Sequence, residues 1–205
     1  MQGALVRVAT SSVTEEQEMN FNSNNNQIAQ GRLRLRPMEV RDAPRVLSYR
    51  RHTDVALYQG WTPETVKEVE DYAVKMKNFG DDIYGHWIQI VIECLTISPV
   101  EIIGDMAFCI DPETKAQAEL GIALDPAFHK NGYGLEATRI LMGHLFDHYK
   151  LHRIHVAIDP GNRASQKLCQ ALGFRQEGHM KESSFFKGEW VDDIVMAVLK
   201  KEWAK

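Results

Sequence analysis

The stretch Ala118-Glu119-Leu120-Gly121-Ile122-Ala123-Leu124-Asp125-Pro126-Ala127-Phe128-His129-Lys130-Asn131-Gly132-Tyr133-Gly134 decides the fold of this chain. Its first seven residues are apolar apart from one carboxylate, and a run of this length predicts a β-strand. Pro126 ends the strand, and two glycines follow with one residue between them. Apolar residues then recur with helical spacing over residues 133–149, at Leu135, Leu141, Met142, Leu145, Phe146 and Tyr149. The predicted order is therefore strand, glycine turn, helix.

The glycine turn, residues 129–134, has the features of an anion-binding site. Glycine permits a positive φ and lets the backbone approach a ligand closely. The N–H groups that open the helix point at such a ligand, and the helix dipole attracts its charge. A Walker loop is excluded because the turn ends in Gly134-Leu135-Glu136, and a dinucleotide fingerprint because the third glycine is missing. By itself, the turn predicts only that an anion can bind at a helix start.

The chain downstream of this helix alternates between strand and helix again. A strand is indicated by the alternating apolar residues Ile154, Val156 and Ile158. Asn162 is a suitable N-cap for a short helix through Leu172, which Gly173 ends. Two closing strands are predicted at residues 175–183 and 191–200.

The chain upstream of the stretch has the same mixture of elements. Leucines alternate with arginines in a strand over residues 32–36, and a helix is predicted over residues 40–51. A second helix is predicted from Thr62 to Asn78, with Thr62 as N-cap and Pro63 at the first helical position. Two further strands are predicted at residues 86–95 and 102–110. Together these elements predict an α+β fold, with a mixed, mostly antiparallel sheet of about seven strands flanked by about four helices.

Length and composition are those of one ordinary domain with a polar extension. The 205 residues suffice for one core. Residues 1–31 hold a run of serine, glutamate and asparagine with few apolar residues to bury, so we predict a flexible extension there and a single domain at residues 32–205.

Composition also argues against several functional classes. The formal net charge of −4 speaks against nucleic-acid binding, which usually needs a basic surface. No apolar run approaches the length of a membrane helix, and the N-terminus lacks the pattern of a secretory signal, so the expected location is cytoplasmic with no membrane partner. The three cysteines, Cys94, Cys109 and Cys169, form no CxxC pair and predict neither a disulfide framework nor a zinc site.

Two segments in the right order carry a resemblance to a known superfamily. Residues 118–137 resemble the acetyl-CoA motif of the GNAT N-acetyltransferases, and residues 162–174 resemble its second cofactor segment. Residues 32–37 and 58–63 are similar to the branch that contains the Rim-type ribosomal-protein N-terminal acetyltransferases. The likeness covers about residues 31 to 203, and two ordered motifs are far more specific than either alone.

The resemblance implies how acetyl-CoA, the expected co-substrate, is held. Strand 118–124 and the strand at 153–158 would splay apart, with the pantetheine arm against the backbone of Ile122, Ala123 and Leu124. Asn162 would hydrogen-bond this arm, and Ser165 would lie on the same wall. The pyrophosphate would bind the turn residues His129, Lys130, Asn131, Gly132, Tyr133 and Gly134.

Two residues are expected to take part in the chemistry. Glu119 is the candidate general base for the amine proton, and the alternative is that it pairs with a basic residue at the sheet edge. Many relatives carry a tyrosine at the position of Cys169, and that tyrosine protonates the departing thiolate. Cys169 is therefore the candidate acid, with Ser165 or a water as alternatives. His129 is a second departure, because the family motif usually has Gln or Arg there.

The acceptor side is less well defined by the sequence. Tyr58 and Trp61 lie between the first two helices, which border the acceptor pocket in this family, and the alternative is that they pack against the core. For Trp87, lining the cleft and packing in the core are both open. No metal is expected, since His144 and His148 lack an acidic partner at matching spacing and are assigned to a solvated helix face.

The leading hypothesis is an enzyme that transfers acetyl from acetyl-CoA to a primary amine, on a protein N-terminus or a small molecule. A non-catalytic coenzyme A-binding sensor or scaffold is the alternative, because Cys169 replaces the usual tyrosine. A longer acyl group is a third reading, since Gly121 and Ala123 leave space. Dimers are common in this branch, and the oligomeric state stays open.

Overall fold

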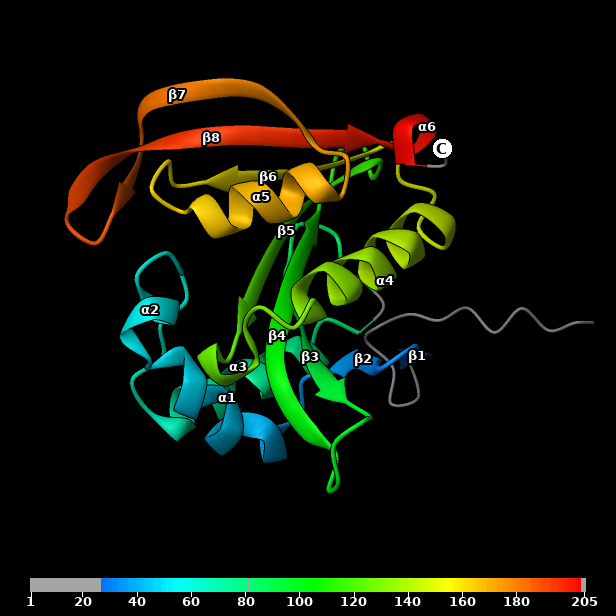
Figure 1. The fold of residues 1–205 in the computed structure, drawn as a ribbon, viewed down its shortest axis with the longest axis vertical. Coiled ribbons are helices and arrows are strands. Elements are labelled where there is room, and N and C mark those ends of the chain that lie inside the picture. The colour runs from blue at the N-terminus through cyan, green and yellow to red at the C-terminus, as the bar shows by residue number, and fades with distance from the viewer. Residues whose placement is uncertain (1–26, 81, 204–205) are drawn as a thin grey trace, which may run out of the picture.

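The computed structural model describes residues 27–80 and 82–203. Within them, eight strands form one sheet in the order β1-β2-β3-β4-β5-β6-β8-β7 (Figure 1). All neighbours are antiparallel except β5 and β6, which are parallel. The strands are β1 (Ile28–Gln30), β2 (Leu33–Pro37), β3 (Trp87–Cys94), β4 (Glu101–Ile110), β5 (Gln117–Leu124), β6 (Arg153–Ile158), β7 (Arg175–Phe186) and β8 (Glu189–Leu199).

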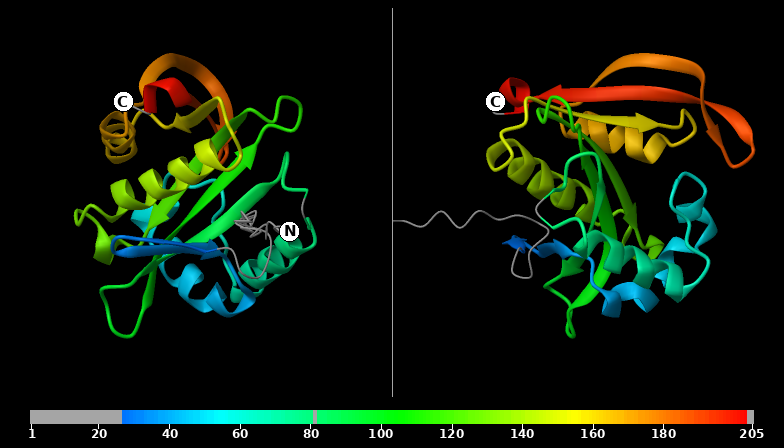
Figure 2. Two further views of the ribbon diagram at one scale, coloured as in Figure 1. Left: turned by 90° about the vertical axis from the view of Figure 1, so that its right-hand side faces the viewer. Right: turned by 180° about the vertical axis from the view of Figure 1, so that it is seen from behind.

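Helices cover both faces of this sheet. The α-helices are α1 (Ala43–Arg50), α2 (Thr53–Ala56), α3 (Val66–Lys77), α4 (Tyr133–Asp147), α5 (Arg163–Ala171) and α6 (Lys200–Trp203), and 3-10 turns lie at Val40–Asp42 and Pro126–Phe128. Ile90 and Ile92 belong to the core under α4, whereas Val91 belongs to the core under α1 and α3. Because successive strand residues face opposite sides, the two helix layers lie on opposite faces of the sheet (Figure 2).

The parallel pair β5 and β6 separates after three residue pairs. Gln117, Ala118 and Glu119 pair with Arg153, Ile154 and His155, and the pairing ends there. Beyond this point β5 continues along β4 to Leu124, and β6 continues along β8 to Ile158. The predicted α+β fold with splayed central strands is thus confirmed, and the splay exposes one edge of β5.

Three details differ from the sequence prediction. Helix α3 begins after Thr65 and not after Thr62, because the Thr65 hydroxyl oxygen accepts from the Glu68 backbone N–H at 3.3 Å and donates to its carboxylate at 2.9 Å. The segment predicted as an extension contains strand β1, the eighth strand, which pairs with β2; residues 1–26 lie outside the described residues. The single-turn helices α2 and α6 were not predicted, since four residues carry too little periodicity.

None of the described helices combines the length and the apolarity that a membrane crossing requires.

Candidate active site

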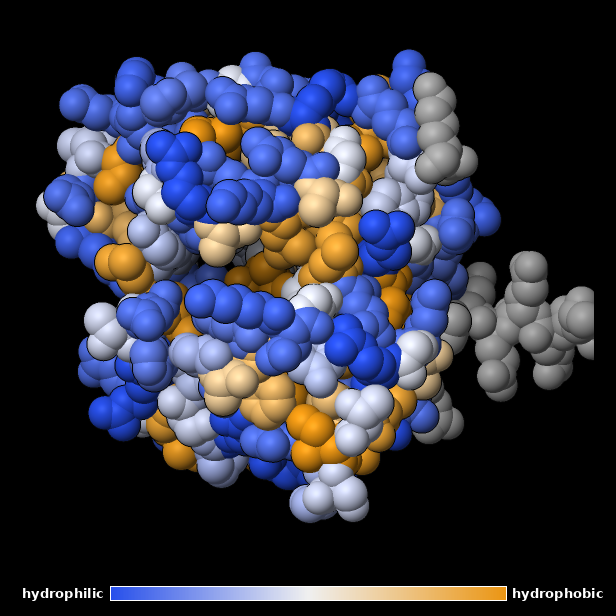
Figure 3. Space-filling model, viewed as in Figure 1, coloured by the Kyte–Doolittle hydropathy of each residue, from blue (hydrophilic) through white to orange (hydrophobic). Residues whose placement is uncertain are grey.

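A cavity of about 540 Å³ opens where β5 and β6 separate. Figure 3 shows the hollow between the two halves of the molecule, with apolar residues in its depth. The cavity brings together residues that were predicted for different tasks, namely Tyr58, Trp61, Trp87, Glu119, Ile122, Asn162, Ser165 and Cys169. It therefore joins the wall formed by α5 to the region between α1 and α3.

The glycine turn adjoins this cavity at the start of α4. Lys130 and Gly132 have φ of 62° and 80°, so two residues of the turn are left-handed. A Cβ at Gly134 would lie 3.2 Å from Leu124 and 3.9 Å from Ile122 and Leu168, so the helix start packs closely against β5 and α5. The first four N–H groups of a helix have no intrahelical acceptor, and those of α4 lie at the turn that packs against the cavity residues Ile122 and Leu168. This geometry suits an anion.

Two side chains of the turn fold back on its backbone. His129 Nε2 donates to the Leu124 carbonyl at 3.0 Å, and Asn131 Nδ2 donates to the His129 carbonyl at 3.1 Å. Both bonds are local, so these two side chains shape the turn.

The exposed edge of β5 carries a contact that sequence reasoning missed. Gln59 Nε2 donates to the Ile122 carbonyl at 3.1 Å, across the cavity that both residues line. The segment around it is anchored, because Lys187 Nζ donates to the Ala56 carbonyl. Ala123, by contrast, is 4 % exposed and faces the α1 side of the sheet. Gln59 lay in a stretch used only for the family resemblance, and nothing local marked its amide.

Helix α5 presents its predicted residues on one wall of the cavity. Asn162 is its N-cap, and Asn162 Oδ1 accepts from the Ser165 backbone N–H at 3.1 Å. This bond leaves the Asn162 amide nitrogen as the group available to a ligand. Cys169 follows one turn after Ser165, which places both on the same face. Burial raises the pKa of the Cys169 thiol to about 11, so the thiol is protonated at neutral pH.

Glu119 lies at the point where β5 and β6 separate. Burial raises the pKa of its carboxyl, and the nearby Asp193 carboxylate on β8 raises it further. Asp193 itself accepts from the hydroxyls of Ser183 at 2.8 Å and Ser184 at 2.5 Å. Among residues 27–80 and 82–203, Glu119 forms no ion pair, so the alternative of a basic partner at the sheet edge finds no support.

Three side chains, Trp61, Tyr72 and Trp87, form an aromatic wall on the side of α1 and α3. The rings of Trp61 and Tyr72 have centroids 4.9 Å apart, and the Tyr72 hydroxyl donates to the Trp87 carbonyl at 3.0 Å. Trp87 is 40 % exposed, which rules out core packing for this residue. Across the cavity, the Tyr58 hydroxyl lies 3.2 Å from where a Cβ on Gly161 would be, so Tyr58 spans from α2 to the loop before α5.

A buried network around Asp105 and Arg50 contacts the aromatic wall at Trp61. Asp105 is fully buried and accepts from Arg50 Nε at 2.8 Å, from the Tyr49 hydroxyl at 2.6 Å and from the Gln89 amide. Arg50 also donates to the Trp61 carbonyl at 2.7 Å and lies 4.4 Å from the centre of its ring. The position of Trp61 therefore depends on a charged pair in the core.

The network was not predicted, although half of it carried a signal. Asp105 is a lone carboxylate within an otherwise apolar strand, and a buried charge of this kind needs a partner. Arg50 gave no signal, because its partner lies 55 residues away along the chain.

The assignment of His144 and His148 to a solvated face is wrong: both are half-buried, and their rings stack with centroids 4.9 Å apart.

Comparison with known proteins gives a family match over most of the chain. Residues 32–175 match the family model described as Acetyltransferase (GNAT) domain. The uncharacterized N-acetyltransferase p20 of Bacillus licheniformis is 28% identical over 174 residues, which cover 84% of this chain and 96% of that protein.

Two relatives from Escherichia coli with stated acceptors match over shorter stretches. The [ribosomal protein uS5]-alanine N-acetyltransferase is 27% identical over 84 residues, 41% of this chain and 43% of that protein. The spermidine N(1)-acetyltransferase is 23% identical over 87 residues, 42% of this chain and 47% of that protein.

Solved structures agree with the fold. An acetyltransferase (GNAT family) from Bacillus anthracis has a TM-score of 0.74 at 26% identity, covering 86% of this chain and 99% of that one. RimJ of Mycobacterium smegmatis, in complex with CoA-disulfide, has a TM-score of 0.72 at 22% identity and covers 84% of each chain.

Proposed function

The chain is an N-acetyltransferase that belongs to the GNAT family, and we propose that it moves the acetyl group of acetyl-CoA to a primary amine by direct attack of the amine on the thioester. The observation that carries the proposal is the single cavity lined by the α5 wall on one side and by Glu119 and the aromatic wall on the other. An acyl donor and an amine that enter from the two sides meet within it. Holding two reactants in this way supplies much of the rate enhancement of such a reaction.

The residues present fit coenzyme A as the donor. The amides that open α4 suit the pyrophosphate, with Lys130 as an additional charge. The edge of β5 beyond Glu119 has no strand beside it, so its backbone groups are open to the amides of the pantetheine arm, except for the Ile122 carbonyl, which accepts from Gln59. Asn162 would donate to the same arm through its amide nitrogen, because its oxygen caps α5.

The proposed chemistry needs one base, one acid and an oxyanion donor. Glu119 takes a proton from the amine, whose nitrogen forms a bond to the thioester carbon. A backbone N–H in the stretch from Ile122 to Leu124 stabilises the negative charge that develops on the oxygen of that carbon. The carbon–sulfur bond then breaks, and Cys169 gives its proton to the departing thiolate, which leaves as free coenzyme A.

The acceptor class is bounded by relatives and by the cavity. The two Escherichia coli relatives are named for acceptors of different kinds, an alanine of ribosomal protein uS5 and the polyamine spermidine. In this chain the cavity holds the Glu119 carboxylate together with the aromatic wall, which suits an amine attached to an apolar group.

The proposal is tested with a panel of small amines and short peptides, assayed for release of free thiol from acetyl-CoA. We expect turnover with at least one amine and saturable binding of acetyl-CoA in the micromolar range. Propionyl-CoA and succinyl-CoA tested in parallel decide whether a longer acyl group is accepted. Absence of acetyl-CoA binding at tens of micromolar would refute the proposal.

Cys169→Ala separates the enzyme from a non-catalytic coenzyme A-binding module. If the thiol protonates the departing thiolate, kcat falls about 10- to 100-fold while KM for acetyl-CoA changes little. Because the pKa of Cys169 is raised to about 11, the donor form persists as pH rises from 7 to 10, and kcat of the wild-type protein is not lost over this window. The measurement is the pH profile of kcat for both proteins.

Ser165→Ala is the matched control, because Ser165 lies on the same wall one turn away. A larger loss of kcat in this variant than in Cys169→Ala would assign the acid to Ser165. A wild-type protein that binds coenzyme A but acetylates no amine in the panel would favour the sensor or scaffold.

A further inference from the structure

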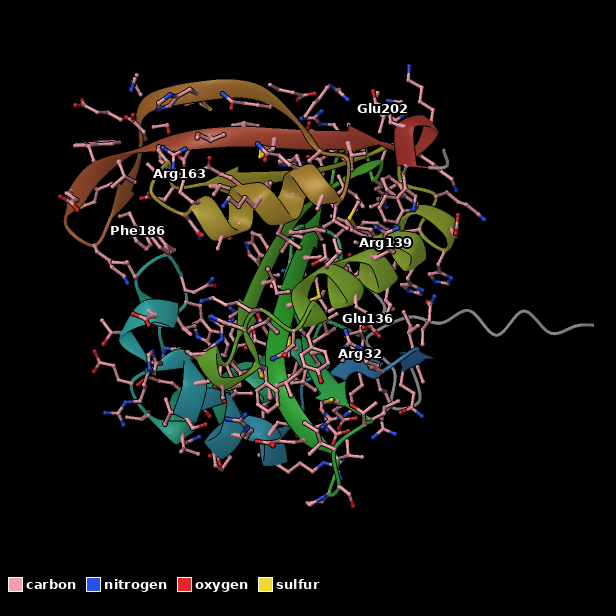
Figure 4. The ribbon with its side chains drawn as sticks, viewed as in Figure 1. Arg32, Glu136, Arg139, Arg163, Phe186 and Glu202 are labelled. Carbon is pink, nitrogen blue, oxygen red and sulfur yellow. The ribbon has the colours of Figure 1, made fainter. Side chains whose placement is uncertain are left out.

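We propose that Arg32 is a positioning residue of the cofactor cradle, by which we mean the glycine turn at residues 129–134 together with the start of α4. Arg32 neutralises the Glu136 carboxylate beside the proposed pyrophosphate site and so permits tight binding of coenzyme A. The inference rests on the proposed function, since it concerns the phosphates of the same donor. Figure 4 labels both residues: Arg32 lies directly before β2, and Glu136 lies in the first turn of α4.

The pair is held by three contacts of different kinds. The Arg32 backbone N–H donates to Glu136 Oε1 at 2.8 Å, and Arg32 Nε donates to Glu136 Oε2 at 2.8 Å. Arg32 Nη2 lies 2.7 Å from the same carboxylate. Gly31 makes this approach possible, because a Cβ there would lie 2.6 Å from Glu136 Oε1, and its φ of 59° is left-handed. The backbone is therefore shaped to bring this guanidinium to this carboxylate.

The same guanidinium also touches the glycine turn. Arg32 Nη2 donates to the Asn131 carbonyl at 3.2 Å, and the group lies 4.4 Å from the centre of the Tyr133 ring. A Cβ on Gly132 would be 3.6 Å from Nη2. Arg32 thus reaches three of the residues that shape the proposed phosphate site, from a position about 100 residues earlier in the chain.

Charge explains why this position needs a cationic side chain. Glu136 is the acidic residue in the first turn of α4. A carboxylate there stabilises the helix in the free protein, because it interacts favourably with the positive end of the helix dipole. The same carboxylate repels a pyrophosphate bound at that helix end. The guanidinium 2.7 Å away makes the pair neutral overall and so offsets this repulsion. Arg32 is partly exposed, so the effect is expected to weaken with salt.

The test measures coenzyme A binding by calorimetry in four variants. Arg32→Ala is expected to raise the Kd about five- to tenfold, because Glu136 is left unpaired beside the phosphates. Arg32→Lys keeps the charge and is expected to stay within about threefold of wild type. Glu136→Gln is expected to lower the Kd about threefold, and the double variant Arg32→Ala with Glu136→Gln to return it to within about threefold of wild type.

Pantetheine, which carries no phosphate, separates charge from local structure. Its binding, followed by thermal shift at millimolar concentration, is expected to be the same in all four variants. Arg175→Ala is the control, since Arg175 forms an exposed pair with Glu202 near α6, and its coenzyme A affinity should match wild type. We expect the loss in Arg32→Ala to shrink in 0.5 M NaCl to about twofold.

Two results would overturn the inference while leaving the proposed function intact. One is an equal loss of coenzyme A and pantetheine binding in Arg32→Ala, which would mean that Arg32 only holds the shape of the turn. The other is a double variant as weak as Arg32→Ala, which would mean that Glu136 does not oppose the phosphates. A wild-type protein that binds neither ligand would refute both the proposed function and the inference.

Discussion

Replacing Glu119 with glutamine is expected to lower kcat about 10²- to 10⁴-fold while coenzyme A binding stays unchanged. The physical reason is that the amide keeps the size of the side chain but cannot take the proton that the attacking amine must lose. The measurement is steady-state kinetics with the best amine of the panel, together with calorimetry for coenzyme A.

The acid limb of the pH profile, where activity is lost as pH falls, gives an independent readout of Glu119. A base is active in its ionised form, and burial together with Asp193 raises the pKa of Glu119 above that of an ordinary glutamate. Activity should therefore be lost as pH falls through this raised pKa, at a higher pH than an exposed carboxylate would give. The residual activity of Glu119→Gln should lack this limb.

Asp193→Asn is the matched control for the profile. Removing the neighbouring negative charge is expected to shift the acid limb to lower pH, because that charge is one of the two causes of the raised pKa. Wild-type kcat in Glu119→Gln, with an unchanged acid limb, would show that another group takes the proton.

Replacing Asp105 with leucine is expected to destabilise the protein by about 3–5 kcal/mol. Arg50 is 4 % exposed on its side chain, and the variant leaves its charge buried without a counter-ion. For a protein of this size, roughly 2–4 °C of Tm are lost per kcal/mol, so the melting temperature should fall by roughly 6–20 °C. Thermal unfolding followed by circular dichroism measures the change.

Two further variants test whether the loss comes from the unpaired charge. Asp71→Asn breaks an exposed ion pair with Lys67 and should change stability by less than about 1 kcal/mol. Combining Asp105→Leu with Arg50→Met removes both buried charges and should recover a large part of the lost stability. A melting point for Asp105→Leu within about 2 °C of wild type would contradict the account of the network.

Most of the helices and strands could be predicted, because each is determined by residues that are close together in the sequence. Strand β5 and helix α4 were predicted from an apolar run and a helical period, and both lie where expected. Asn162 was predicted as the N-cap of α5, and its side chain accepts from the Ser165 backbone N–H in the structure. The start of α3 was predicted at Thr62 and lies at Thr65, whose hydroxyl oxygen accepts from the Glu68 backbone N–H.

The site was less predictable, because its contacts join residues that are far apart in the chain. Gln59 reaches Ile122 across 63 residues, and Arg50 reaches Asp105 across 55. Nothing in the neighbourhood of Gln59 or Arg50 requires such a partner. The order of strands in the sheet creates these contacts, and a single sequence carries no local record of that order.

The sequence by itself determined that a glycine turn opens α4, since a turn with a left-handed Gly132 needs glycine, and a helix start leaves N–H groups without an intrahelical acceptor. It also determined, through two ordered motifs, the family to which the chain belongs. Only the tertiary structure decided what surrounds the site. It brought Arg32 to Glu136 at the cradle and placed Glu119 where burial and Asp193 raise its pKa. Both depend on contacts between residues that are far apart in the chain, and these contacts arise only once the sheet has formed.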